Sequence, residues 1–230
     1  MKIGVVGLGL IGGSIYRDLK ALGYEAVAVS QSQNGEGIYK TYDVLKDCGV
    51  VFVCTPMNKT LAVLDELETV LPPQAIVADA CSLKKFVTEK SRSYRFVPTH
   101  PMAGTEKKGF ENSFEGLFKG AKWVITGESP PELLQIIKEL GAEPVFMCAD
   151  EHDAAAALVS HMPMVVAKGI LMAAVDDEQA LSIAGSGFRD MTRLAYTNEE
   201  MAQDMINMNS ENIQVALLKL YNAIGKVLKQ

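Results

Sequence analysis

The strongest candidate for a reacting side chain in this sequence is His100, which lies in the segment Thr99–Glu106 (THPMAGTE). An imidazole titrates near neutral pH, so it can take the proton of an alcohol while that alcohol loses a hydride. The sequence has three histidines, and His100 follows a short apolar run and precedes a loop that contains Gly104. A lone histidine can also be a structural group. We expect His100 to point from this loop into a cleft and to act as a general base.

Two further clusters could bind or orient a substrate. Ser82 follows an expected strand, at the edge of a parallel sheet where ligands bind. Its alternative role is to cap the next helix, and the two roles are compatible. Arg189 and Arg193 are four residues apart, so on a helix they share one face, and such a pair suits a carboxylate. The alternative for Arg189 is an ion pair with a surface acid, which would contribute little.

The other two histidines, His152 and His161, are weaker candidates. His152 lies in the first turn of an expected helix, and we interpret it as local structure. His161 is about half a turn out of phase with His152 on an ideal helix. The two could share a metal only if Pro163 bends the helix strongly, so we predict no metal site.

A glycine-rich turn near the N-terminus predicts the class of cofactor. The spacing G-x-G-x-x-G is formed by Gly7, Leu8, Gly9, Leu10, Ile11 and Gly12, between an apolar run and a helical pattern. In a dinucleotide-binding βαβ unit the first glycine permits a tight turn and the second lets the backbone approach a pyrophosphate. The third allows a helix to pack closely on a strand. The alternative is a glycine-rich turn in a flavodoxin-like or other α/β protein, but we predict a nicotinamide dinucleotide site.

The end of the second expected strand distinguishes NADP from NAD. Enzymes that use NAD usually carry an acidic residue there for the ribose hydroxyls, whereas this chain has Ser30 and Gln31. Hydroxyl and amide donors can bind a 2′-phosphate, and no carboxylate repels it. The arginine that usually accompanies a 2′-phosphate is missing, and Lys40 is the nearest base. We therefore expect NADP to be preferred and NAD to be the alternative.

Residues 1–149 alternate between strand-like and helix-like segments. Strands are expected at 3–6, 26–30, 50–55, 75–80, 96–97, 122–126 and 144–147, and helices at 10–22, 58–70, 83–90 and 130–140. Strands that are apolar throughout and separated by helices indicate a mainly parallel sheet with helices on both faces. We predict an α/β fold with an N-terminal Rossmann-type domain over residues 1–149.

Residues 150–230 read as helix throughout. Asp150 is an expected N-cap, and the run 154–175 is apolar nearly all round, which suits a helix buried by other helices or by a second subunit. We predict a small all-helical C-terminal domain that packs on the first domain or on a partner's copy of itself. A homodimer through these helices is the expected assembly.

Composition restricts the partners and the compartment. The formal net charge of −6 argues against nucleic acid, because binding phosphates along a strand needs clustered Lys and Arg. The most apolar stretch is interrupted by His161, Pro163 and Lys168, which argues against a membrane span. The four cysteines form no C-x-x-C pair, which fits a reducing cytoplasm better than a disulfide framework. We expect a cytoplasmic enzyme that acts on a small molecule.

Taken together, the chain resembles the prephenate/arogenate (cyclohexadienyl) dehydrogenase family. The matching segments, in family order, are GLGLIGGS at 7–14, CTP at 54–56, DACSLK at 79–84, HPMAGTE at 100–106, HD at 152–153, SHMP at 160–163 and GFRDMTR at 187–193. HPMAGT and GFRDxTR are specific to the family, whereas the glycine motif is not. The resemblance covers nearly the whole chain.

The resemblance implies a reaction and roles for individual residues. The reaction is oxidation of the ring hydroxyl of a cyclohexadienyl substrate, with hydride transfer to the nicotinamide and loss of the ring carboxylate as CO₂, in tyrosine biosynthesis. By this resemblance His100 deprotonates the hydroxyl and Ser82 helps to hold His100 and the substrate. The implied substrate-binding residues are Arg193, which binds a carboxylate, Thr105, and Glu106 at the entrance. The implied cofactor-binding residues after the glycine turn are Ser30, Gln31, Cys54, Thr55 and Pro56.

The chain departs from the family pattern at several points. Met164 stands where relatives that use prephenate often carry a second histidine, and no aromatic residue lies near Ala202, where several relatives carry tryptophan. These differences favour arogenate over prephenate. The interval 30–50 is short, as if one helix were missing. The alternative functions are another NADP-dependent hydroxyacid dehydrogenase, whose usual catalytic lysine segment is not evident here, and a non-catalytic nucleotide-binding dimer.

Overall fold

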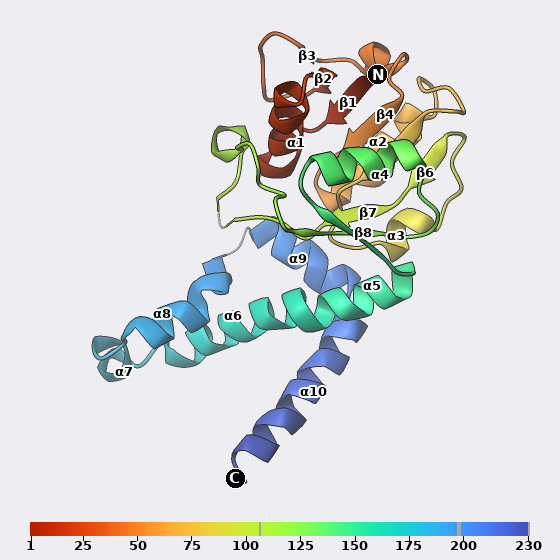
Figure 1. The fold of residues 1–230 in the computed structure, drawn as a ribbon. Coiled ribbons are helices and arrows are strands. Elements are labelled where there is room, and N and C mark those ends of the chain that lie inside the picture. Colours follow the sequence, from red (N-terminus) through yellow and green to blue (C-terminus); the bar gives the residue numbers. More distant parts are fainter. Residues whose placement is uncertain (106, 197–198, 230) are drawn as a thin grey trace. The chain divides into compact units, whose positions relative to one another are not determined.

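The computed structural model describes residues 1–105, 107–196 and 199–229. The chain divides into two compact units, Met1–His152 and Asp153–Gln230. The division falls inside helix α5 (Ala149–Ala156). The first unit contains the strands and the second is helical (Figure 1).

A parallel sheet with strand order β3-β2-β1-β4-β5-β6 forms the centre of the first unit. Its strands are β1 (Lys2–Val6), β2 (Glu25–Val29), β3 (Ile38–Tyr39), β4 (Val50–Val53), β5 (Ile76–Asp79) and β6 (Arg95–Val97). β1 pairs with both β2 and β4, so Val5 lies between Ala28 and Phe52. The prediction of a mainly parallel Rossmann-type sheet is confirmed.

Alternate residues of β1 face two separate apolar cores, because successive side chains of a strand point to opposite faces. Ile3 and Val5 lie in the core that also contains side chains of α1 (Leu10–Ala21) and α4 (Pro131–Glu139). Val6 lies in the core filled by α2 (Met57–Leu67). The sheet is therefore covered by helices on both faces, as expected.

A second, smaller sheet follows, with strand order β7-β8-β9. Its strands are β7 (Thr99–Pro101), β8 (Lys122–Ile125) and β9 (Glu143–Phe146). His100 lies within β7, opposite Val124 of the antiparallel strand β8. His100 follows β6 and precedes the loop that contains Gly104, as expected, but it lies in a short strand that the sequence pattern did not predict. A three-residue strand that ends in Pro101 is too short to leave an alternating pattern in the sequence.

The connection from β2 to β3 contains no crossover helix. Parallel neighbours normally need a connection of about a dozen residues or more, usually a helix. Here residues 30–37, all of which the structure describes, run directly from one strand to the next, and the 3₁₀ helix η1 (Tyr42–Leu45) follows. Gly37 has φ +77°, and a Cβ there would come within 2.7 Å of the Tyr16 hydroxyl. The expected loss of a helix between residues 30 and 50 is confirmed.

Two expectations about helix starts are wrong. The helix expected over 83–90 is the shorter α3 (Lys85–Thr88), and its N-cap is Lys84, not Ser82. Asp150 already lies inside α5, which begins at Ala149. Cys148 takes the capping position instead, because its backbone N–H donates to Glu151 Oε2 (3.0 Å) while its Sγ accepts from the Glu151 N–H (3.5 Å). This is the reciprocal pattern of a capping box, with cysteine in place of serine.

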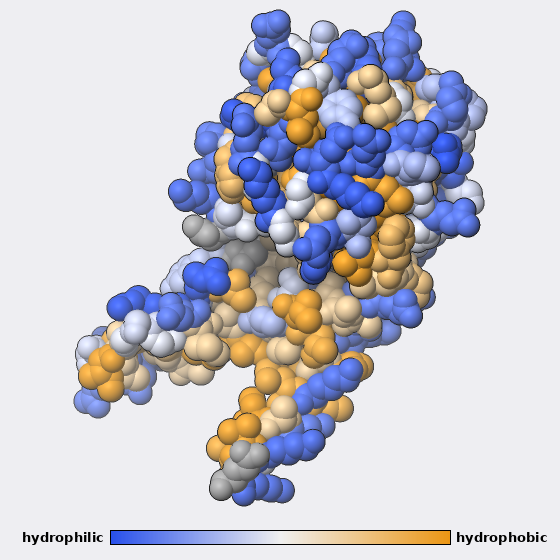
Figure 2. Space-filling view, viewed as in Figure 1, coloured by the Kyte–Doolittle hydropathy of each residue, from blue (hydrophilic) through white to orange (hydrophobic). Residues whose placement is uncertain are grey.

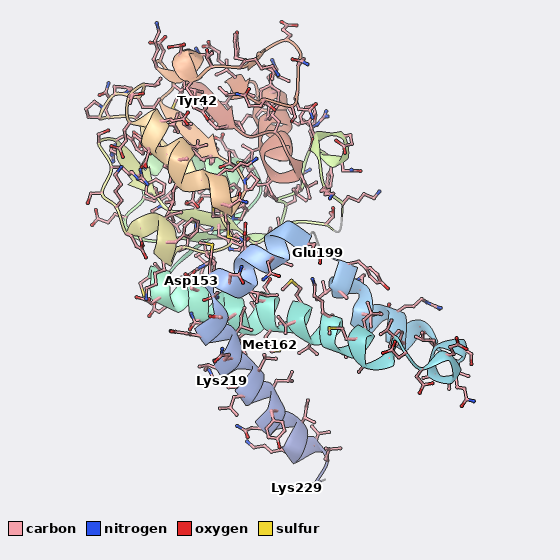
Figure 3. All side chains as sticks on the ribbon, turned by 180° about the vertical axis from the view of Figure 1, so that it is seen from behind. Tyr42, Asp153, Met162, Glu199, Lys219 and Lys229 are labelled. Carbon is pink, nitrogen blue, oxygen red and sulfur yellow. The ribbon has the colours of Figure 1, made fainter. Side chains whose placement is uncertain are left out.

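The second unit is built from short and long helices around one irregular turn. Its elements after α5 are the π-helical turn η3 (Ala157–His161), α6 (Met162–Ala174), α7 (Glu178–Ser182), α8 (Ser186–Thr192), the 3₁₀ helix η4 (Arg193–Tyr196), α9 (Glu199–Met208) and α10 (Ser210–Val227). Figure 3 labels Met162, where the π turn gives way to α6, Lys219 near the middle of α10, and Lys229 just after its end. The end of α10 extends away from the other helices of the unit in Figures 1 and 3.

Much of the apolar surface of the second unit is exposed. Figure 2 shows hydrophobic side chains along its long helices. On α10 these exposed side chains are Val215, Leu218, Tyr221, Ile224 and Val227. The described helix Ala149–Ala174 is long and apolar enough to span a membrane by length and composition, and 28% of its most apolar window is buried. This chain alone therefore leaves large apolar faces uncovered.

Candidate active site

The glycine turn between β1 and α1 has three glycines with three different surroundings. Gly7 has φ +89°, a conformation that side chains rarely adopt. A Cβ on Gly12 would lie 1.9 Å from the Gly7 carbonyl oxygen, so close packing of α1 on the turn requires glycine. A Cβ on Gly9 would meet no atom of the described residues within 4 Å. The fold thus needs Gly7 and Gly12, whereas Gly9 keeps open space at the N-cap of α1.

That open space fits a pyrophosphate. Gly9 is the N-cap of α1, and no described side chain caps the helix. The uncapped N–H groups and the helix dipole at such an end attract phosphate. These features fit the predicted dinucleotide.

The turn after β4 lies directly beside the glycine turn. Cys54 donates its N–H to the Val6 carbonyl (2.7 Å), and its Cβ would lie 2.9 Å from a Cβ on Gly12. Thr55 Oγ1 lies 3.0 Å from Thr60 Oγ1, and Pro56 is the N-cap of α2. The structure therefore brings these three predicted cofactor residues to the edge of the sheet that carries the glycine turn.

The loop after β2 is held by a lysine. Lys40 Nζ donates to the carbonyls of Ser30 (2.9 Å), Gln31 (3.1 Å) and Gln33 (2.7 Å). Gln31 Nε2 donates back to the Lys40 carbonyl (2.9 Å), and Ser30 Oγ accepts from the Gln33 N–H (3.2 Å). The missing crossover helix makes this possible, because β3 delivers Lys40 to the carboxyl end of β2. A positive charge therefore lies at the end of β2, where many dinucleotide-binding folds place an acid.

A buried ion pair joins the turn after β5 to β7. Asp79 and Lys84 are both fully buried and bonded to each other. The Asp79 carboxylate accepts the N–H groups of Cys81 (3.0 Å) and Thr99 (2.9 Å), and Lys84 Nζ also donates to the Thr99 carbonyl. This network fixes Cys81 and Lys84 on either side of half-buried Ser82, and it fixes Thr99, the residue before His100. Ser82 and His100 are thus positioned by one buried charge pair.

His100 contacts a second histidine. Its Nδ1 lies 2.9 Å from Nε2 of His152, with ring centroids 5.1 Å apart and ring planes at 74°. His152 is 2% exposed and lies on α5 within the first unit. The interpretation of His152 as local structure is therefore wrong. The histidine–aspartate match at 152–153 was the available signal, but no sequence spacing indicates a contact between residues 52 positions apart.

The remaining predicted site residues are placed as follows. Thr105 is exposed, and its Oγ1 accepts the Lys107 N–H (3.2 Å). Glu106 lies outside the described residues. Arg189 lies on α8 and Arg193 directly after it, and both are exposed. Neither guanidinium forms an ion pair with a described residue, so the surface-acid alternative for Arg189 finds no partner there.

His161 belongs to a separate buried network in the second unit. Asn209 Nδ2 lies 3.1 Å from His161 Nδ1 and donates to the Asp153 carbonyl (2.9 Å). His161 ends the π-helical turn, a feature that often marks functional sites in helices. No group of three or more His, Cys, Asp or Glu within the described ranges is arranged to hold a metal ion.

The cysteines near the site are poor nucleophiles. Burial raises the pKa of the Cys81 thiol to about 12 and that of Cys54 further still. Both thiols therefore stay protonated near neutral pH. His100 therefore remains our candidate for the group that takes a proton.

Comparisons with known proteins identify a family for both units of the chain. Residues 25–144 match the family model of the prephenate dehydrogenase nucleotide-binding domain, and residues 148–229 match that of the prephenate dehydrogenase dimerization domain. The chain is 30% identical to the prephenate dehydrogenase of Lactococcus lactis and 28% identical to that of Bacillus subtilis. Each alignment covers 91% of this chain, and the chain spans 65% and 64% of the length of these relatives.

A solved structure has the same fold along its length. The Synechocystis arogenate dehydrogenase superposes with a TM-score of 0.85 at 30% identity, covering 100% of this chain and 91% of that one. The nucleotide-binding domain of the family is thus followed by its dimerization domain along this chain. The chain belongs to the prephenate dehydrogenase family.

Proposed function

We propose that the protein catalyses the NAD(P)-dependent oxidative decarboxylation of a cyclohexadienyl substrate, in tyrosine biosynthesis in the cytoplasm. The observation that carries the proposal is the placement of His100 in the unit that holds the glycine turn, with its Nδ1 bonded to His152. A histidine held at one ring nitrogen presents the other in a defined direction. Family membership supports the reaction class.

In this proposal the protein's own groups move the proton and hold the substrate. The ring hydroxyl gives its proton to Nε2 of His100, and Ser82 helps to orient that hydroxyl. The nicotinamide, when bound, supplies the hydride acceptor. The bond from the ring to its carboxylate then breaks, CO₂ leaves, and the electron pair stays in the ring. Because the ring becomes aromatic, this step is irreversible.

Arg193 is the proposed partner of a substrate carboxylate. It is exposed and makes no ion pair within the described part of the chain, so its guanidinium is available for a bidentate contact. Thr105 and Glu106 are proposed substrate-binding residues by resemblance alone. Buried Met164 and Ala202 offer no hydrogen bond at two positions where relatives carry polar or aromatic groups, which supports arogenate over prephenate.

We propose NADP as the preferred cofactor. The support is the positive charge of Lys40 beside Ser30 and Gln31, with uncharged residues from Ser30 to Gly35 directly after β2. Two unit charges about 4 Å apart interact with about 1 kcal/mol in water and about 4 kcal/mol at an effective dielectric constant of 20. Lys40 is exposed, so its effect on 2′-phosphate affinity lies near the water limit, on the order of tenfold. Lys40→Gln should therefore lower kcat/KM for NADP by about tenfold and change that for NAD little, with exposed Lys46→Gln as the control. Equal losses with both cofactors would contradict this role.

We propose a homodimer through the helical unit. The match to a dimerization domain and the exposed apolar side chains of α10 support a second copy as the partner. Leu218→Glu should give monomers by light scattering, whereas the neighbouring Lys219→Glu should remain dimeric. A wild-type monomer that floats with lipid vesicles would instead identify a membrane as the partner of the apolar helix.

One assay tests the function itself. Purified protein is given arogenate or prephenate, each with NADP or NAD, and the nicotinamide absorbance is followed. We expect turnover, fastest with arogenate and NADP. Absence of turnover in all four combinations, with NADP still bound, would favour a non-catalytic nucleotide-binding dimer.

A further inference from the structure

The histidine pair is mounted on well-fixed backbone on both sides. His100 lies in β7, which pairs with β8. The residue before it, Thr99, is bonded through its N–H to Asp79 and through its carbonyl to Lys84. His152 lies one turn into α5, and its backbone N–H donates to the Cys148 carbonyl (2.9 Å). The reciprocal bonds of Cys148 with Glu151 cap this first turn. Both rings therefore have little freedom to separate.

The geometry of the pair restricts the tautomers. A nitrogen–nitrogen distance of 2.9 Å is a hydrogen bond, so one ring donates and the other accepts. If His100 takes a proton on Nε2, its Nδ1 must already carry hydrogen. Nε2 of His152 is then the acceptor, and the hydrogen of neutral His152 is on Nδ1. One arrangement of protons thus suits the reaction, and the opposite arrangement blocks the base.

We propose that His152 is a positioning residue that accepts a hydrogen bond from Nδ1–H of His100 and holds it in the tautomer that can act as a base. The inference rests on the proposed function and adds a residue to it. When the substrate proton arrives on Nε2, His100 becomes an imidazolium, and its Nδ1–H bond to His152 becomes charge-assisted and stronger. His152 is 2% exposed and does not need to touch the substrate. The proton returns from His100 Nε2 to solvent after product leaves.

This role has the logic of a third group that orients a catalytic histidine, with a neutral imidazole in place of a carboxylate. A neutral acceptor stabilises the imidazolium less than a buried carboxylate would. It also adds no negative charge next to a substrate that loses its own carboxylate.

The first experiment compares two substitutions. His152→Leu removes the acceptor, whereas His152→Gln keeps one, because the side-chain amide can reach the position of Nε2. Hydrogen bonds to charged groups contribute about 1.5–3 kcal/mol, which corresponds to a tenfold to hundredfold change in rate. We expect His152→Leu to lower kcat by that factor with little change in the KM for NADP, and His152→Gln to recover most of the loss. Asp150 lies on the same helix as His152, and Asp150→Asn, which removes an exposed ion pair with Lys85 of α3, is the control.

The second experiment needs no activity. Nitrogen-15 NMR of histidine-labelled wild-type protein, without ligand and above the pH at which imidazoles are protonated, reports which ring nitrogen carries hydrogen. We expect Nδ1–H on both His100 and His152. His100 protonated on Nε2, a His152→Leu variant with normal kcat, or a His152→Gln variant as impaired as the leucine variant would each overturn the inference. A wild-type protein that turns over no substrate would refute the proposed function, while the NMR result would still decide the pairing.

Discussion

Replacing Lys84 by methionine should be among the most destabilising single changes in the first unit. Lys84 and Asp79 are both fully buried, and the substitution leaves the Asp79 carboxylate without its cation. The Thr99 carbonyl also loses a donor. Breaking one side of a buried ion pair costs about 3–5 kcal/mol, because the remaining charge is left uncompensated. We expect the free energy of unfolding of the first unit to fall by that amount.

Trp123 makes the measurement direct. It is the only tryptophan in the sequence, it is fully buried, and it packs against Phe52 and Phe118 in one core of the first unit. Its fluorescence during urea unfolding therefore reports on that unit. A loss of about 3–5 kcal/mol corresponds to a decrease in Tm of roughly 6–20 °C for a chain of this size.

The neighbouring lysine is a matched control. Lys85 pairs with Asp150 at 2.9 Å, but both side chains are more than half exposed, at 67% and 75%. Lys85→Met should therefore cost less than about 1 kcal/mol. Combining Lys84→Met with Asp79→Asn should restore part of the free energy of unfolding, because the unpaired carboxylate charge is removed. The amide oxygen can still accept one backbone N–H. Equal stabilities of the Lys84→Met and Lys85→Met proteins would mean that the buried pair contributes no more than the exposed one.

Three further predictions follow from particular residues. Gly12→Ala should impair folding, because its Cβ would lie 1.9 Å from the Gly7 carbonyl oxygen, and calorimetry measures this loss. Gly9→Ala should fold normally but bind NADP more weakly in a cofactor titration. Unimpaired NADP binding by Gly9→Ala would contradict a pyrophosphate site at Gly9. Burial raises the pKa of Asp18, so the folded state holds this proton more tightly and stability falls as pH rises through the raised pKa. Asp18→Asn should then be more stable than wild type at pH 7 and lose this advantage at acidic pH, and urea unfolding at both pH values checks the sign. Burial raises the pKa of the Cys48 thiol to about 11 and also raises the pKa values of the Cys54 and Cys81 thiols. A thiol reagent at pH 8 should therefore label exposed Cys148 first. Rapid labelling of two or more thiols would contradict this prediction.

The parts of the fold that could be predicted depend on local sequence. The glycine turn follows from the backbone needs of Gly7 and Gly12, which apply to any chain with this spacing. Strands β1, β4 and β5 are apolar except for Lys2 at the start of β1 and Asp79 at the end of β5. Both faces of the sheet are covered, and this pattern is visible in the sequence. The interval from Ser30 to Val50 is short compared with the family pattern, and this difference predicted the loss of a helix there.

The parts that could not be predicted depend on long-range pairing. β3 and β7 are only two and three residues long, and each exists because a neighbouring strand supplies its hydrogen bonds. The contact of His100 with His152 requires α5 to return to β7, which no local pattern encodes. Cys148 replaced Asp150 as the helix cap because a sulfur atom can accept the same N–H that an oxygen would, although cysteine is an unusual cap.

We propose that His100 takes the proton of a substrate hydroxyl while hydride is transferred to the nicotinamide. The most direct test is the steady-state rate of His100→Asn beside wild type, with arogenate and NADP, together with NADP affinity measured by titration. We predict a fall in kcat of roughly 10²–10⁴, the contribution of a general base, with NADP affinity unchanged. If wild type turns over and His100→Asn turns over at nearly the same rate, His100 is not the general base.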